Sequence, residues 1–395
     1  MEKISEQGRL RPWMGIALFG AVLAFLIFVA SPLQIKLGIP GLIITEIGLL
    51  IIAIVFCLIR KVKIREVFPV KKIKVSEFIG CILIVIGSFP VSVLLLCFTA
   101  MVLPSSVAEI TPLTDFIYGN LNYPLAVLIV ALMPAVCEEA INRGAILSNF
   151  RSLKHDWVIV LIMGLFFGLF HVTVLRFLPT MFIGMLFSFV LVKKNNILLA
   201  MLMHFTNNLI SISMTYLSGQ NEATMAAASN ADYSAVFGIY LILGFLCPVI
   251  ITLGVMLVDP KGHKKIRFLY AGILSAVMLI SGIAFTAVKF SHSMILNTTF
   301  SYVVTEDDKE CSMIDFDVEE SRSATVAATL INAEGSYTIR IDGDSGSNII
   351  NAEFPEDAVR MVTYNVDLEP DHYTVTIIPG DDAINEHPEF QIMIR

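Results

Sequence analysis

Long apolar runs fill the first three quarters of the chain. Nine of them can be delimited, at residues 13–33, 38–59, 77–103, 122–149, 157–174, 177–192, 196–218, 235–258 and 268–289. A helix needs about 20 apolar residues to cross the hydrocarbon core of a bilayer, whereas a transmembrane β-barrel would show short alternating segments. The pattern therefore predicts an α-helical polytopic membrane domain over residues 1–289, with about nine transmembrane helices.

The pattern changes to a period of two in residues 290–395. Apolar and polar residues alternate there in three short runs, marked by Tyr337, Ile339 and Ile341, by Val362, Tyr364 and Val366, and by Tyr373, Val375 and Ile377. Such alternation is typical of half-buried antiparallel strands. Seven or eight strands in about 100 residues predict a C-terminal all-β sandwich domain. The segment Leu368-Glu-Pro-Asp-His-Tyr373 also predicts a tyrosine corner, in which the Tyr hydroxyl bonds back to the preceding loop.

Composition and charge divide the chain at the same point. Apolar residues make up 56% of the sequence and the mean hydropathy is +0.78, both typical of a membrane protein. From Phe290 onward there are 21 acidic and 5 basic residues, whereas the part before it has 13 acidic and 22 basic residues. We attribute the basic excess to membrane topology and contact with anionic lipids, not to nucleic-acid binding.

The distribution of lysine and arginine predicts the orientation. The N-terminal segment carries Lys3, Arg9 and Arg11, and the loops after the second, fourth, sixth and eighth apolar runs are also basic. The other loops carry few such residues, so the N-terminus is expected to be cytoplasmic. Nine spans would then place residues 290–395 outside the cell membrane. The first run lacks a small-x-small cleavage site and is expected to remain as an anchor.

Three ionisable residues interrupt the fourth apolar run: Glu138, Glu139 and Arg143. An ionised side chain at the bilayer centre costs roughly 2.5–3.5 kcal/mol, so their presence needs a reason. Glu139 and Arg143 are four residues apart and face each other on a helix, which predicts an ion pair. Glu139 is expected to turn toward Arg143 and away from the cluster that Glu138 would form with the histidines of later helices. Glu138 is left over for chemistry, with Asn142 as a polar neighbour that could hold it.

Two later apolar runs each contain one histidine, His171 and His204, and Asn208 shares a helix face with His204. With Glu138, these side chains could line one polar cavity and activate water. Glu138 would accept a proton, His171 would hold the water, and His204 with Asn208 would donate to an oxyanion. Equally, Glu138, His171 and His204 could bind zinc. A proton relay in a transporter, or histidines that merely bond to carbonyl groups, are further alternatives.

These residues resemble the motifs of the CPBP intramembrane protease family, which includes the CAAX prenyl endopeptidases and the bacterial Abi proteins. The family motifs Glu-Glu-x-x-x-Arg, Phe-x-x-x-His and His-x-x-x-Asn occur in order between about residues 120 and 210, as Glu138, Glu139 and Arg143, as Phe167 and His171, and as His204 and Asn208. Gly144 matches the glycine that usually follows the arginine, whereas Asn142 replaces the usual phenylalanine. The resemblance implies an eight-helix core, with one span and the sandwich as additions. It leaves the metal dependence open.

The sequence thus favours an intramembrane endopeptidase that cleaves a membrane-associated protein or peptide. The β domain would then recognise a substrate, a partner or a wall component. The alternative is a non-enzymatic scaffold or bacteriocin immunity protein with the same fold, whose outer β domain binds an external ligand. A proton-coupled transporter ranks third, because the hydropathy pattern shows no inverted repeat.

Overall fold

The computed structural model divides the chain into two compact units, Met1–Thr286 and Ala287–Arg395. The first is helical and the second is built from β-strands. The structure describes residues 10–109, 121–217, 233–261, 264–293, 295–301, 303–305, 310–330, 335–346, 348–354, 361–383 and 387–395.

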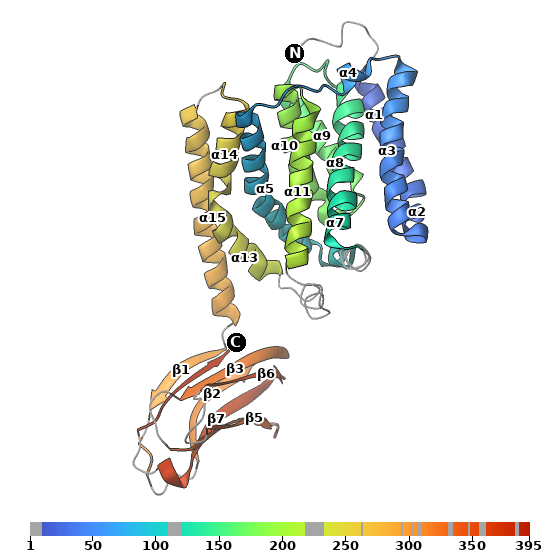
Figure 1. The fold of residues 1–395 in the computed structure, drawn as a ribbon. Helices are drawn as coiled ribbons and strands as arrows, with labels where there is room; N and C mark the ends of the chain where they lie inside the picture. Colours follow the sequence, from blue (N-terminus) through green and yellow to red (C-terminus); the bar gives the residue numbers. More distant parts are fainter. Residues whose placement is uncertain are drawn as a thin grey trace. The chain divides into compact units, whose positions relative to one another are not determined.

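Eight helical segments in the described part of the chain are long and apolar enough to cross a membrane (Figure 1). Several are composed of consecutive helical stretches that include π-helical or 3₁₀ turns. In chain order the eight are α1 (Pro12–Phe25), η2 (Leu26–Ala30) and α2 (Ser31–Leu37); α3 (Ile39–Arg60); α5 (Val75–Val102); α7 (Tyr123–Ala126), η4 (Val127–Leu132), α8 (Met133–Glu139) and η5 (Ala140–Ile146); α10 (Val174–Lys194); α11 (Ile197–Leu217); α13 (Tyr233–Leu243), η6 (Gly244–Leu246) and α14 (Cys247–Val258); and α15 (Lys264–Ser293).

The fifth of the nine expected spans forms a shorter helix, α9 (Asp156–Phe170), of 15 residues. It ends before the apolar run does, because the chain turns at Val172, whose φ is 54°. The short connection lets α9 pack closely against α10, and a Cβ on Gly168 would lie 2.9 Å from the carbonyl oxygen of Phe177. Lys193 Nζ, near the end of α10, lies 3.0 Å from Asp156 Oδ2 at the start of α9. The α9–α10 hairpin therefore returns to the end of the bundle at which it began.

Several basic loops meet at this same end of the helical unit. The backbone of Lys71, which follows the short helix α4 (Ile64–Val67), exchanges two hydrogen bonds with the Asn196 side chain, at 3.2 and 3.0 Å. Arg151 Nη1 donates to Asn195 Oδ1 at 2.6 Å. Figure 1 shows the connection between α14 and α15 at this end too. We call it the basic end; Lys3 and Arg9 lie outside the described residues.

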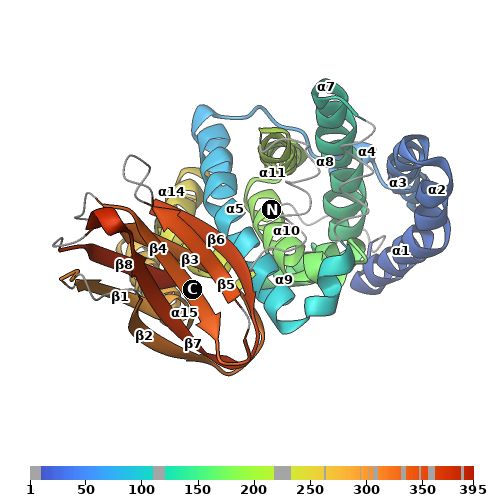
Figure 2. The same ribbon diagram turned by 90° about the horizontal axis from the view of Figure 1, so that it is seen from below.

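The view along the bundle shows how the helices with the candidate residues are arranged (Figure 2). The segment that contains α8 lies between α3 on one side and α11 on the other. Helix α10 packs against both α9 and α5. The helices that carry the three sequence motifs therefore adjoin one another inside the bundle.

The C-terminal unit contains two four-stranded antiparallel sheets, as the alternating pattern predicted. Their strand orders are β1-β8-β3-β6 and β2-β7-β4-β5. The strands are β1 (Leu296–Ser301), β2 (Cys311–Val318), β3 (Arg322–Leu330), β4 (Tyr337–Gly343), β5 (Asn348–Phe354), β6 (Met361–Leu368), β7 (Asp371–Pro379) and β8 (Glu389–Ile394). Buried residues of both sheets form one hydrophobic core, in which the rings of Tyr337 and Phe390 meet edge to face with centroids 5.3 Å apart. The predicted sandwich is confirmed.

Side chains at the start of β7 fix two neighbouring parts of the β domain. Asp371 Oδ2 accepts from the backbone N–H and the hydroxyl of Ser345, in the turn between β4 and β5, and these bonds lower the pKa of Asp371. His372 Nδ1 lies 2.7 Å from Asp317 Oδ1 of β2, and this hydrogen bond raises the pKa of His372. Charged side chains thus tie the start of β7 to both of its neighbours.

The predicted tyrosine corner is also present. The Tyr373 hydroxyl donates to the carbonyl oxygen of Glu369 at 2.9 Å and accepts from the Glu369 N–H at 3.1 Å. The Tyr373 ring is buried and stacks on Phe316, with centroids 5.3 Å apart. The corner therefore joins the turn between β6 and β7 to the core.

We expect Tyr373→Phe to lower the free energy of unfolding of the β domain by about 1 kcal/mol, because it removes the hydroxyl hydrogen bonds but keeps the ring. Chemical denaturation monitored by near-ultraviolet circular dichroism would measure the change. Tyr364→Phe is the matched control, because the Tyr364 ring is 40% exposed. Equal effects of the two changes would contradict the role of the corner.

Candidate active site

Arg143 is fully buried and lies at the centre of the candidate site. It belongs to the π-helical segment η5, and its exposed fraction is 0%. Nη1 donates to Glu139 Oε1 at 2.8 Å and Nη2 donates to the carbonyl oxygen of Gly184 at 3.1 Å. The guanidinium carbon lies 4.1 Å from the centroid of the Phe167 ring. An ion pair, a carbonyl group and an aromatic face together compensate its charge in the apolar bundle.

Glu139 connects this arginine to a histidine of another helix. Its Oε1 also lies 2.9 Å from His204 Nδ1, and both side chains are almost completely buried. The expected ion pair with Arg143 is confirmed. The expectation that Glu139 turns away from the histidines is wrong, because one carboxylate oxygen serves both Arg143 and His204. The structural pair and the candidate catalytic group are therefore joined directly.

The aromatic ring of Phe167 in α9 contacts the guanidinium group of Arg143 and the imidazole rings of two histidines. The His171 ring meets it edge to face with centroids 4.9 Å apart, and the His204 ring does so at 5.7 Å. The ring of Phe187 in α10 lies 5.7 Å from that of His204. Both histidines therefore lie on one aromatic cluster, next to Arg143. The sequence motif Phe-x-x-x-His predicted Phe167 as part of the site, but nothing in the sequence marked Phe187.

His171 lies at the end of α9, immediately before a strained turn. Its Nδ1 is 2.9 Å from the carbonyl oxygen of Phe167. Because a carbonyl oxygen only accepts, this contact places the proton on Nδ1 and leaves the lone pair on Nε2. The following residue, Val172, has a φ of 54°, which β-branched residues rarely adopt. Strain of this kind occurs mainly where the structure holds a functional group in place.

Glu138 differs from Glu139 in that its carboxylate lacks an ion-pair partner within the described part of the chain. Its Oε2 is buried and has no hydrogen-bond partner among the described residues. Asn142 does not hold this carboxylate as expected, since its Nδ2 donates to the backbone oxygen of Glu138 at 3.0 Å. Glu138 is thus an acid next to Glu139 in the sequence whose Oε2 is left without a partner among the described residues.

Asn208 lies one turn after His204 on α11, as the spacing predicted. Its Nδ2 donates to the carbonyl oxygen of Val130 at 3.2 Å, and its Oδ1 accepts from Asn207 at 3.2 Å. The amide ties α11 to the π-helical segment η4 at this level. A carboxamide nitrogen has two N–H groups, so one bond to Val130 leaves a second donor for a substrate.

Sequence reasoning assigned no role to Glu46 of α3, although intramembrane acids are functional by default. The structure buries Glu46 to 4% exposure, and its Oε2 has no hydrogen-bond partner among the described residues. Helix α3, which carries Glu46, packs against α8, which carries Glu138. Glu46 is therefore a second buried acid in this part of the bundle, contributed by a helix that lies outside the three motifs.

The expected zinc ligands do not form an ion site as they are arranged. Among the described residues, no three His, Cys, Asp or Glu side chains lie close enough together to hold a metal ion. The rings of His171 and His204 both contact the Phe167 ring.

Comparison with known families supports the resemblance seen in the motifs. Residues 120–210 match the sequence model of a family described as type II CAAX prenyl endopeptidase Rce1-like. This range contains all three motifs, so the resemblance is confirmed for this segment. Residues 120–210 are thus similar to a family of CAAX prenyl endopeptidases, and the eight long apolar helices in the described part of the chain agree with a multi-pass membrane protein.

The remaining comparisons contribute no further function. The comparison with curated proteins gives no match. Among solved structures, the chain is similar to the pre-peptidase C-terminal domain of a collagenase from Bacillus anthracis. This similarity has 15% identity and a TM-score of 0.21, and it covers 25% of this chain and 90% of that chain.

We expect Gly184→Ala to destabilise the helical unit by about 1–3 kcal/mol, the usual cost of overpacking. A Cβ on Gly184 would lie 2.7 Å from Phe167 Cβ, so α9 and α10 would have to separate beside Arg143. Thermal unfolding in detergent would measure the loss. Gly272→Ala in α15 is the matched control, because a Cβ there meets nothing within 4 Å. A Gly184→Ala variant as stable as this control would contradict the close packing.

Proposed function

We propose that the protein is an intramembrane endopeptidase that hydrolyses a peptide bond of a membrane-associated protein or peptide. Glu138 acts as the general base, His171 holds the water, and His204 with Asn208 stabilises the oxyanion. Glu139 and Arg143 support His204. The observation that carries the proposal is the buried series Arg143–Glu139–His204, preceded directly in the sequence by Glu138, whose Oε2 has no partner among the described residues.

His204 is suited to donate a proton or a hydrogen bond to the reacting carbonyl group. Its Nδ1 faces Glu139, so Nε2 is the nitrogen that a substrate can reach. A carboxylate on Nδ1 stabilises the positive charge of an imidazolium, as the buried acid does in hydrolases with a catalytic triad. Arg143 donates to the same carboxylate oxygen and holds Glu139 in place for this role. The Nε2–H of His204 would then stabilise the oxyanion of the tetrahedral intermediate.

Glu138 and His171 are suited to activate the attacking water. The lone pair on His171 Nε2 can accept a hydrogen bond from water, because its Nδ1 proton is committed to Phe167. Glu138 can accept the proton that the water loses on attack, and can pass it to the leaving amine. Glu139 is less suited to accept this proton, because its carboxylate is already bonded to Arg143 and His204.

The depth of the site fits a substrate that enters the membrane. Glu139 lies seven residues before the end of its segment at Ile146, which places it about 10 Å from the basic end of the bundle. That is about a third of the 30 Å hydrocarbon core. A peptide bond must therefore leave bulk water to reach Glu138, which favours a substrate with a membrane-embedded segment.

The convergence of basic loops at one end supports an orientation with that end in the cytoplasm. The α9–α10 hairpin begins and ends there, so the short length of α9 does not change the count of crossings. Helix α15 starts at the basic end and is long enough to cross the membrane. The β domain would then follow on the external side, where it would bind an external ligand.

We expect Glu138→Gln to lower the rate of cleavage by about 10²–10⁴-fold, because an amide cannot act as the base. The substrate is found by comparing the new N-termini of membrane proteins in cells with the wild-type chain and with Glu138→Gln. Rates are then measured on that substrate with purified protein in liposomes. Glu66→Gln is the matched control, since Glu66 lies outside the site in a surface ion pair with Lys63 at 3.6 Å. Equal turnover by Glu138→Gln and wild type would disprove the base assignment.

The orientation can be tested with cysteine labelling in whole cells. In a Cys311→Ser background the other five native cysteines are buried. We expect an impermeant maleimide to label Ser345→Cys of the β domain but not Lys63→Cys at the basic end. Permeabilised cells, in which both should react, provide the control. The opposite labelling pattern would reverse the proposed topology.

A further inference from the structure

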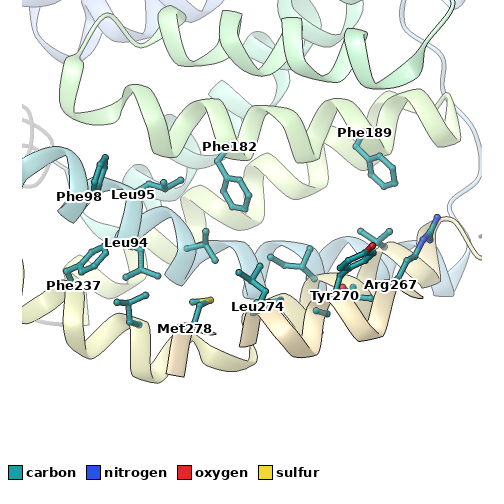
Figure 3. A pocket seen from close by; sticks show the side chains of 17 residues that line it. Leu94, Leu95, Phe98, Phe182, Phe189, Phe237, Arg267, Tyr270, Leu274 and Met278 are labelled. Atoms are coloured by element: carbon teal, nitrogen blue, oxygen red, sulfur yellow. The ribbon is translucent and has the colours of Figure 1, made fainter. Parts of the chain in front are cut away.

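A cavity of about 910 Å³ lies between α10 and α15 (Figure 3). Phe182 and Phe189 of α10 face it from one side. Leu274 and Met278 of α15 face it from the other, and α5, α13 and α14 complete the lining. The size is within the range of about 300–1,000 Å³ that ligand pockets occupy.

This cavity, which we call the groove, has a lining that is unsuited to water. Of the residues that line it, Thr252, Arg267 and Tyr270 are the ones with polar side chains, and the others are aliphatic or aromatic apart from Met278. Ordered water needs two to four polar partners, so apolar cavities stay dry. In a bilayer, the apolar molecules that can fill such a space are lipid chains.

The groove has a polar end and an apolar end. Figure 3 shows Arg267 and Tyr270 at one end and Phe98 and Phe237 at the other. From Arg267 to Met278, eleven residues of α15 rise by about 16 Å. That is about half of the 30 Å hydrocarbon core. The groove therefore has the length of a lipid chain in one leaflet.

The polar end coincides with the basic end of the bundle. Arg267 donates to the carbonyl oxygens of Asp259 and Lys261, both at 3.2 Å, which holds its guanidinium at the mouth of the groove. The exposed side chains of Lys261, Lys264 and Lys265 lie in the same short segment. Asp259, 3.9 Å from Arg267, is the acidic residue there, so the local charge is positive. A phosphate group fits this charge.

We propose that this groove binds one acyl chain of an anionic glycerophospholipid from the leaflet at the basic end, with the phosphate at Arg267. The bound chain packs against the face of α10 that carries Phe182 and Phe189. The opposite face of the same helix carries Gly184 and Phe187, which contact Arg143. The lipid site and the candidate active site thus share one helix as a wall.

Native mass spectrometry of the purified full chain tests the proposal. The probes are phosphatidylglycerol and phosphatidylcholine with identical chains. We expect the wild-type chain to retain phosphatidylglycerol at least tenfold more than Leu274→Trp, because the indole fills the groove. Ile273→Trp is the matched control, since Ile273 is 53% exposed and does not line the groove. We also expect Arg267→Gln to abolish the preference for phosphatidylglycerol over phosphatidylcholine.

A second measurement uses the unaltered chain, in case Leu274→Trp does not fold. A phosphatidylglycerol with a photoreactive group on its acyl chain should label Phe182, Leu274 or their neighbours in the groove, more than the outer face of α15 around Ile273. Equal retention by Leu274→Trp and Ile273→Trp, or uniform labelling around α15, would overturn the groove as the site. Equal retention of the two lipids by the wild-type chain would overturn the assignment of the phosphate to Arg267.

Discussion

The structure of the site depends on neutralising one buried guanidinium. Arg143 has no exposed surface, and removing one partner of a buried ion pair costs about 3–5 kcal/mol. Its partners come from three places: Glu139 on its own segment, the Gly184 carbonyl group on α10 and the Phe167 ring on α9. Satisfying Arg143 therefore fixes the relative positions of these helices. The same contacts place the imidazole rings of His171 and His204 against the ring of Phe167.

Helix α10 shows how this constraint is met within a tightly packed bundle. Because Gly184 lacks a Cβ, α10 approaches Phe167 closely, and its carbonyl oxygen reaches Arg143. In membranes, small residues at helix interfaces replace the hydrophobic driving force that is missing there. The larger side chains of α10, Phe182 and Phe189, lie on the other face, where the helices are farther apart and the groove opens. One helix thus combines a close interface and an open one.

The sequence predicted most of the helices and strands because apolar runs and period-two alternation report burial directly. It overestimated the length of α9, since the apolar run continues past Val172 although the chain turns there. The three motifs identified the polar residues that meet in the bundle. The sequence could not reveal that Glu139 also contacts His204, because that contact joins residues 65 positions apart. The contact of Phe187 with His204 was missed for the same reason.

Glu139 Oε1 bonds to both Arg143 and His204, and this determines the roles that Glu138 and Glu139 can have. Had Glu139 bonded to Arg143 alone, it would serve folding, and Glu138 would serve chemistry. Because one oxygen accepts from both Arg143 and His204, the ion pair that stabilises the bundle also sets the orientation of the candidate oxyanion donor. Glu139 cannot at the same time serve as a base without releasing both partners. The role of proton acceptor therefore falls to Glu138, the acid whose carboxylate makes no such bonds within the described residues.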